Sequence, residues 1–485
     1  MKNKKRLLAF VLALTLLVTM FTPVSAAADT TAKPIKSTIY VNGEKAEIKG
    51  YSIDNNSYFE LRDLGESVNF GVKFDTKGNN IYISTPQTKQ VRVLKKNNWA
   101  PDTYSALNNL IKHNGILSSK YDPNNKPYVV FDFDNTTVIN DVEEALLIYQ
   151  LENLRFKIAP KQMKEVLETG IPDINKSFGA DYNNLTVEII ATDCANDYEY
   201  LYKNYEGFGA GGKMKLAEIQ KTNEYKDFIT KVRYLYDGVN DTFDASVGYP
   251  WVTYLFTGMT PAEVYKLADE SHTYWRNYGK FTKLTWESPK ALPGKAGVVS
   301  VSYKTGITFP VEVQDLYKTL MDNGIDVYVC SASFIDVIKA ACHEPEYELN
   351  VKKGNVYAMM LKLDANGRYI NKYDNNYFQT QGKGKSHTID KFIRSKYNNR
   401  GPIMVAGDSA GDYNMMIDYA DMQLGLLFNR YRKDDTKKLA QMAEKVLGQS
   451  SAKYVLQGRD ENKGVLRPTE KTILLGDARE VLVRK

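Results

Sequence analysis

Three short hydrophobic runs, far apart along the chain, each end in a polar residue, and this recurrence constrains the fold more than any other feature. The runs are PYVVFD at 127–132, IDVYVCS at 325–331 and IMVAGD at 403–408. From about residue 100 onward, such runs alternate with segments of helical periodicity, which is the pattern of a parallel α/β sheet. Ligands of open α/β sheets bind at the carboxyl ends of the strands. We therefore expect Asp132, Ser331 and Asp408 at one edge of a sheet.

The long segment between the first two runs has a different character. It is rich in Tyr, Asn and Lys, has helical spacing and lacks a comparable strand pattern. We interpret it as a large, mainly helical cap inserted at about 141–305 into an α/β domain that covers 100–485.

The beginning of the chain has the pattern of a secretory signal peptide over residues 1–26. Four basic residues precede an apolar run and the small residues before position 27. Removing residues 1–26 takes away four basic residues and no acidic ones. This leaves 60 basic residues, from 64 minus 4, against 58 acidic ones, a net charge of +2. This near-neutral balance gives no reason to expect nucleic-acid binding. We expect a secreted or cell-surface protein of the Gram-positive type.

The three cysteines, Cys194, Cys330 and Cys342, are too few for a disulfide framework and allow at most one bridge. The chain also has four histidines, and this small number argues against a zinc site built from His and Cys.

Residues 34–87 form a separate pattern with two alternating strand segments, STIYVNGEKAEI and NNIYIST, around the helically spaced YFELRDLGESV. This predicts a small α+β module. The pattern resembles the copper amine oxidase N-terminal-like stalk domain of exported Gram-positive proteins. No histidine or cysteine lies at 30–112, so copper ligands are missing. We interpret the module as a spacer that could associate with the cell envelope.

The segment FDFDNTTV at 131–138 places Asp132 and Asp134 two residues apart, directly after a buried strand. In extended backbone both side chains point the same way. Two carboxylates held together need a cation or a shared proton. A capped junction between a strand and a helix would explain this segment if it stood alone.

Further polar residues follow the other runs: Ser331, then Asp408 and Asp412 in GDSAGD, with Lys383 and Lys385 in QGKGKSHTI between them. The chain thus carries a nucleophile, an acid, a hydroxyl donor, a cation and carboxylates suited to Mg²⁺, which prefers hard oxygen ligands. We favour Lys385 over Lys383, because Ile389 and Phe392 suggest that Lys385 opens a helix.

Over about residues 125–430 these motifs resemble the haloacid dehalogenase superfamily, with likeness to its phosphorylcholine and phosphoserine phosphatase-like members. The resemblance implies a doubly wound parallel sheet and a cap inserted between the motif with Asp132 and Asp134 and the motif with Ser331. It implies that Mg²⁺ is held by Asp132, Asp408 and the backbone carbonyl of Asp134, with Asp412 as a further ligand or neighbour. The motifs therefore predict a magnesium-dependent phosphomonoesterase that acts on small molecules.

The chemistry follows from the residue types. Attack of the Asp132 carboxylate on a phosphate dianion needs charge neutralisation by Mg²⁺ and a lysine. Asp134 can protonate the leaving oxygen and later activate water. A dehalogenase would not need this acid, since halide leaves as an anion. Ser331 is expected to hold a phosphoryl oxygen.

Substrate choice is expected to come from the stretch INDVEEALLIYQLENL at 139–154. Asp141 and Glu144 predict a capping box. The paired Glu143 and Glu144 resemble glutamates that contact the trimethylammonium group in phosphorylcholine phosphatases. Phosphocholine or phosphoethanolamine is therefore the expected substrate. Two alternatives stay open: a broad-specificity or phosphoserine-type acid phosphatase, and a surface-binding protein without catalysis. Trp251, Tyr254 and Trp275 could supply aromatic faces for a cation, or they could equally belong to the core of the cap.

Overall fold

The chain forms two compact units, residues 1–90 and 91–485. The computed structural model describes residues 32–36, 39–41, 44–46, 48–53, 56–61, 63–64, 71–75, 80–84, 92–449 and 452–485. The signal peptide expected at 1–26 lies outside these residues. Within the described part, no helix is both long enough and apolar enough to cross a bilayer.

The N-terminal unit is built from antiparallel strands. β1 (Lys33–Pro34), β4 (Gly50–Ile53) and β5 (Asn56–Phe59) form one sheet, and β2 (Ile39–Val41) pairs with β3 (Glu44–Ala46). β6 (Gly71–Asp75) pairs with β7 (Asn80–Ser84). The amide of Leu64 donates to the carbonyl of Glu60, an i to i−4 bond typical of a helical turn. The likeness to a copper amine oxidase stalk stays a prediction.

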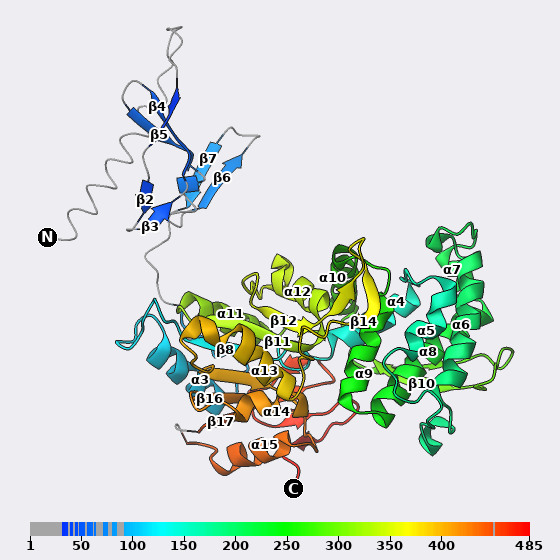
Figure 1. The fold of residues 1–485 in the computed structure, drawn as a ribbon. Coiled ribbons are helices and arrows are strands. Elements are labelled where there is room, and N and C mark those ends of the chain that lie inside the picture. Colours follow the sequence, from blue (N-terminus) through cyan, green and yellow to red (C-terminus); the bar gives the residue numbers. More distant parts are fainter. Residues whose placement is uncertain are drawn as a thin grey trace. The chain divides into compact units, whose positions relative to one another are not determined.

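The second unit is organised by a six-stranded sheet in which every pairing is parallel (Figure 1). Its strands are β8 (Tyr128–Phe131), β11 (Asp326–Phe334), β12 (Val356–Met359), β15 (Met404–Gly407), β16 (Leu424–Phe428) and β17 (Tyr454–Gln457), in the spatial order β12-β11-β8-β15-β16-β17. Numbered along the chain, this order is 3-2-1-4-5-6, which is a doubly wound sheet. The order reverses between β8 and β15, and ligands bind at such a switch point. The expected fold class is confirmed.

Both faces of the sheet are covered by helices because its strands are apolar on both sides. Along β8, Val129 and Phe131 belong to one buried cluster, whereas Tyr128 and Val130 belong to another. The first cluster includes residues of α3 (Pro101–Asn114), α11 (Val311–Asp322) and α12 (Ile335–His343). The second includes residues of α13 (Lys383–Phe392), α14 (Ala410–Ile417) and α15 (Thr436–Lys445).

The segment between β8 and β11 begins with a mainly helical cap. Its helices are α4 (Val142–Glu152), α5 (Met163–Glu168), α6 (Val187–Asn204), α7 (Leu216–Ile219), α8 (Asn223–Thr242), α9 (Ala245–Trp251) and α10 (Pro261–Tyr278). It ends in an antiparallel pair, β9 (Lys283–Glu287) and β10 (Ser300–Lys304), which the sequence analysis missed. Both strands alternate polar and apolar residues, as KLTWE and SVSYK, so a local strand signal was present within a segment that had been interpreted as helical.

Two further strand groups lie outside the central sheet. β13 (Leu361–Leu363) and β14 (Tyr369–Tyr373) form a hairpin after β12. The C-terminal segment forms a small sheet of β18 (Arg459–Asp460), β19 (Val465–Leu466), β20 (Thr472–Ile473) and β21 (Glu480–Val481). All three cysteines are buried and free.

Candidate active site

Three carboxylates meet at the switch point of the sheet. Asp132 follows β8, Asp408 follows β15, and Asp412 lies in the first turn of α14. The amide of Asp132 donates to the carbonyl of Ala406 across 2.9 Å, which ties the ends of β8 and β15 together. One oxygen from each of the three carboxylates lies within 4.8 Å of the others. The structure thus brings together three residues separated by up to 280 positions, from 412 minus 132.

Asp412 reaches this cluster because the turn before α14 is very tight. A Cβ atom at Gly407 would lie 2.5 Å from Asp412 Cβ, so only glycine permits this approach. Asp412 Oδ2 accepts hydrogen bonds from the amides of Asp408 and Ser409, at 2.9 and 3.1 Å. These bonds fix Asp412 while they orient the backbone that carries Asp408.

Lys385 is the lysine that the fold places in the site. Its Nζ lies 2.5 Å from Asp132 Oδ1 and 2.7 Å from Asp412 Oδ1, and its side chain is 1% exposed. Lys383 starts α13 and is exposed. The other oxygen of Asp132 accepts a hydrogen bond from the Thr136 hydroxyl at 2.9 Å. Both oxygens of the predicted nucleophile are therefore held.

The electrostatics of the cluster call for an additional cation. Burial, followed by the charge of Asp412, raises the pKa of Asp132 to about 8. Burial also raises the pKa of Asp412, although Lys385 opposes it. Burial acts to lower the pKa of Lys385, but Asp132 and Asp412 outweigh it and raise that pKa. Buried hard oxygen donors at this spacing fit the ligands that Mg²⁺ takes in proteins.

Asp134 lies beside this cluster and is held by different partners. Its Oδ2 accepts from the Ser333 hydroxyl at 2.6 Å and from the Ser331 hydroxyl at 3.2 Å, and its Oδ1 accepts from the amide of Val142 at 2.7 Å. Burial raises the pKa of Asp134 to about 7, and the Ser333 hydrogen bond acts against that rise. A carboxyl group with this pKa can carry a proton near neutrality and also give it up.

The carboxylates open into a cavity of about 560 Å³ between the sheet edge and the cap. Asp132, Asp134, Lys385, Asp408 and Asp412 line its floor. The cap contributes acidic residues, which are Asp141, Glu143, Glu144, Asp237 and Asp241. Three cations, Lys304, Arg430 and Arg432, also line it. The predicted site residues thus surround one cavity, with the exception of Ser331, which reaches it through Asp134.

The two glutamates of α4 differ in their surroundings. Asp141 caps α4 by accepting bonds from the amides of Glu143 and Glu144, at 2.9 Å each. Glu143 is buried, accepts a bond of 2.7 Å from the amide of Phe334, and has its other oxygen without a partner among the described residues. Burial raises the pKa of Glu143 to about 8. Glu144 is partly exposed and lines the cavity.

The aromatic residues suggested by the sequence lie in the cap core. Trp251, Tyr254 and Trp275 are all nearly inaccessible, and the Trp275 indole donates to the carbonyl of Ala145 at 2.7 Å. The aromatic side chains that line the cavity are Tyr236 and Tyr249. Sequence spacing could not single them out, because α8 carries three tyrosines and α9 carries a tryptophan two residues after Tyr249.

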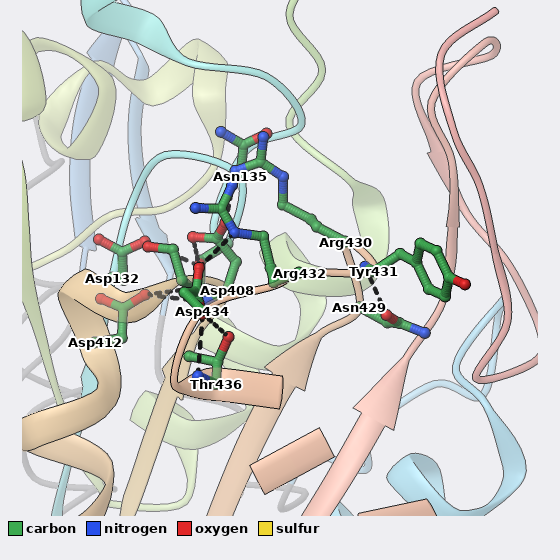
Figure 2. Close-up of polar contacts among 12 residues, drawn as sticks. Asp132, Asn135, Asp408, Asp412, Asn429, Arg430, Tyr431, Arg432, Asp434 and Thr436 are labelled. Atoms are coloured by element: carbon green, nitrogen blue, oxygen red, sulfur yellow. Dashed lines mark hydrogen bonds and ion pairs between the residues drawn. The ribbon is translucent and has the colours of Figure 1, made fainter. Parts of the chain in front are cut away.

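Arg430 was missed by the sequence analysis. Its Nη1 lies 2.6 Å from Asp408 Oδ2 (Figure 2). It follows β16, whose run LGLLF was not recognised as a strand of the same sheet. Recognition of that run would have placed Arg430 at the same edge as the other site residues.

Arg459, from the C-terminal sheet, was also missed. It is fully buried and donates to the carbonyl and the side-chain oxygen of Asn135, at 3.1 and 3.0 Å. Asn135 has a φ of 60°, a left-handed conformation that asparagine tolerates. Arg459 therefore fixes the loop that carries Asp132 and Asp134.

The doubly wound sheet, the cap between its first two strands, and the residues Asp132, Asp134, Ser331, Lys385 and Asp408 match what the resemblance to the haloacid dehalogenase superfamily implies. A solved structure of a conserved protein of unknown function from Anaerococcus prevotii is 32% identical, with a TM-score of 0.73 over 80% of this chain and 99% of that one. The chain belongs to the same family as that protein. No family model matches the chain.

A curated relative carries a functional name. The phosphorylcholine phosphatase of Pseudomonas aeruginosa is 26% identical over 282 residues, which cover 56% of this chain. The match spans 58% of the length of that relative.

Proposed function

We propose that the protein is a magnesium-dependent phosphomonoesterase that forms an aspartyl-phosphate on Asp132. One observation carries this proposal: the Asp132 carboxylate lies in a cavity with Lys385 at 2.5 Å on one side and the acid Asp134 beside it. A phosphoryl group transferred to Asp132 needs positive charge around its oxygens and a proton for the leaving group. Both requirements are met by residues of this cavity.

Asp132 attacks phosphorus, and the bond between phosphorus and the leaving oxygen breaks. Asp134, whose raised pKa allows it to hold a proton, donates that proton to the leaving oxygen. Asp134 then takes a proton from a water molecule that attacks the aspartyl-phosphate, which releases inorganic phosphate. Lys385 neutralises charge next to Asp132, and Ser331 and Ser333 orient Asp134. In this structure Ser331 bonds to Asp134, so its expected contact with a phosphoryl oxygen remains part of the proposal.

Asp132, Asp408 and Asp412 would hold Mg²⁺, with the Asp134 carbonyl as the resemblance implies. The ion would supply Lewis-acid neutralisation of the phosphoryl charge. The buried oxygen cluster and its raised carboxyl pKa values support this assignment.

Phosphate esters of small amino alcohols, with phosphocholine or phosphoethanolamine first, are the proposed substrates. The acidic cap wall, which includes Glu144 and Asp237, favours a cationic leaving group. Tyr236 and Tyr249 offer aromatic surface on the same wall. The name of the Pseudomonas aeruginosa relative supports the same class. Glu143 contributes a full charge only when a cation in the cavity offsets its raised pKa.

The second candidate is a broad-specificity or phosphoserine-type acid phosphatase. The cations Lys304 and Arg430 favour it, because they could accept the carboxylate of phosphoserine. A binding protein without catalysis would have no use for the hydrogen-bonded acid Asp134.

We further propose that the protein is exported and that its N-terminal unit associates with the cell envelope.

Release of phosphate from para-nitrophenyl phosphate, with and without Mg²⁺, tests the activity. We expect magnesium-dependent turnover, and its absence in folded protein would contradict the proposal. Catalytic efficiencies for phosphocholine, phosphoserine and glycerol phosphate then test the substrate class. We expect Glu143→Gln and Glu144→Gln to lower the efficiency for phosphocholine more than for glycerol phosphate. Equal losses would leave a broad-specificity phosphatase.

A further inference from the structure

Arg430 occupies a distinctive position in the charge balance of the site. When the three carboxylates are ionised, Lys385 compensates Asp132 and Asp412, and Arg430 compensates Asp408. Three negative charges against two positive ones leave a single negative charge in a buried cluster. Arg430 therefore serves as the counter-ion of the carboxylate that the sequence motifs assign to the metal.

Lys385 and Arg430 are held very differently. Lys385 is 1% exposed and lies between two carboxylates. The Arg430 side chain is 17% exposed, lines the cavity, and has Asp408 as its one polar side-chain contact within the described part of the chain. The guanidinium of Arg430 is thus free to leave Asp408 and remain in the cavity.

The backbone beneath Arg430 is fixed. The Asn429 side chain donates to the carbonyls of Glu470 and Leu482, at 2.8 and 2.6 Å, and its oxygen accepts from the amide of Tyr431 at 3.0 Å (Figure 2). Arg484 donates to the carbonyl of Tyr431 at 2.7 Å. An anchored loop whose side chain has a single ion-pair partner can present the same guanidinium to two neighbouring partners at little cost in backbone ordering.

We propose that Arg430 is an exchangeable counter-ion: it pairs with Asp408 in the metal-free protein, is released when a divalent cation binds Asp408, and then binds the phosphoryl oxygens. The cation and Arg430 compete for one carboxylate, and two positive charges repel each other there. A planar guanidinium suits a phosphate group because it can donate two hydrogen bonds to it. This inference rests on the proposed function in that the anion is a phosphoryl group.

The exchange has a thermodynamic signature that a purely structural ion pair lacks. Removal of Arg430 frees Asp408 for the cation, so the affinity for Mg²⁺ rises. The same change removes a ligand of the anion, so the affinity of the magnesium-loaded protein for phosphate falls. The two effects have opposite signs. A residue that only stabilises the fold would weaken both interactions or neither.

Isothermal titration calorimetry with Mg²⁺ on the metal-free protein, and with inorganic phosphate on the magnesium-loaded protein, tests this inference without turnover. For Arg430→Gln we expect Mg²⁺ to bind roughly five-fold more tightly and phosphate to bind about ten-fold more weakly. Arg430→Lys should restore part of the phosphate affinity. Arg432→Gln is the matched control, because Arg432 pairs with Asp434 at 2.7 Å and makes no hydrogen bond or ion pair with the three carboxylates. This variant should change Mg²⁺ affinity little.

Unchanged or weaker Mg²⁺ binding in Arg430→Gln would overturn the inference, as would unchanged phosphate affinity. These failures differ from failure of the proposed function. Full phosphatase activity with unaltered Mg²⁺ affinity in Arg430→Gln would reject the exchange alone. The predicted pair of affinity changes without hydrolysis of para-nitrophenyl phosphate would reject the enzyme and retain the exchange.

Discussion

The Ser333 hydroxyl donates a hydrogen bond of 2.6 Å to Asp134 Oδ2. Ser331 donates to the same oxygen at 3.2 Å and also accepts a bond from the amide of Ser333 at 3.1 Å. The end of β11 therefore holds the predicted acid in place. A hydrogen bond donated to a carboxylate stabilises its ionised form and lowers its pKa.

Replacement of Ser333 should change the pH profile. Asp134 must be protonated to act as an acid, so kcat/KM for alkyl phosphates should fall as the pH rises through its pKa, which lies at about 7 before Mg²⁺ binds. In Ser333→Ala the lost bond raises this pKa, and the alkaline limb should move up by about one pH unit. Ser331→Ala removes the longer bond and should move it less. An unchanged limb in both variants would contradict the role of Asp134.

Substitution of Asp132 and of Asp134 should separate their roles. Asp132→Asn should abolish turnover, because an amide does not attack phosphorus. Asp134→Asn should lower turnover of alkyl phosphates by about 10² to 10⁴-fold, yet retain phosphoenzyme formation from para-nitrophenyl phosphate, whose leaving group needs no proton. Acid-quenched protein analysed by mass spectrometry would detect the phosphoenzyme. Near-normal rates in Asp132→Asn would refute the nucleophile assignment.

Lys385 and Lys383 form a matched pair for testing the lysine. Lys385→Ala removes a buried cation between two carboxylates and should lower stability by about 3 kcal/mol at neutral pH, with loss of activity. Lys383 is exposed, so Lys383→Ala should retain both the stability and the activity of the unchanged protein. Urea unfolding and para-nitrophenyl phosphate turnover measure the two effects. Equal losses of stability and turnover in the two variants would contradict the placement of Lys385 in the site.

Mg²⁺ should stabilise the protein more as the pH rises. The pKa of Asp132 is raised to about 8 in the metal-free fold, against about 4 in an unfolded chain. The stability from its bound proton is fully present below about pH 4 and is lost as the pH rises through about 8. Protons and Mg²⁺ compete for the carboxylates. Thermal melting should therefore show a larger Mg²⁺-induced rise in Tm at high pH than at low pH, and Asp132→Asn should reduce the difference. A rise independent of pH would count against metal binding by Asp132.

Deletion of residues 27–90 should leave kcat nearly unchanged. All residues that line the cavity lie within 91–485. Circular dichroism would confirm folding of the truncated protein before its turnover is compared with that of the full chain. Loss of activity in folded, truncated protein would show that the N-terminal unit contributes to the site.

The sequence alone predicted the sheet edge at which the site lies. A parallel strand and the polar residue after it form a local pattern, and carboxyl ends of parallel strands always share one edge. Asp132, Ser331 and Asp408 could therefore be grouped although nothing in the sequence gives a distance between them. The helical periodicity of the insertion likewise predicted a cap, since amphipathic spacing is also local.

The tertiary structure decided which side chains meet. Lys385, rather than Lys383, pairs with Asp132 because the packing of α13 against the sheet buries one of two lysines only two positions apart. Ser333 joined the site because β11 continues past Ser331 to Phe334. Arg430 joined it because it follows β16, which the sequence had not marked as a strand. The C-terminal Arg459 reaches Asn135 across 324 positions. Such partners depend on how distant segments pack together, and that information is not present in any local pattern of the chain.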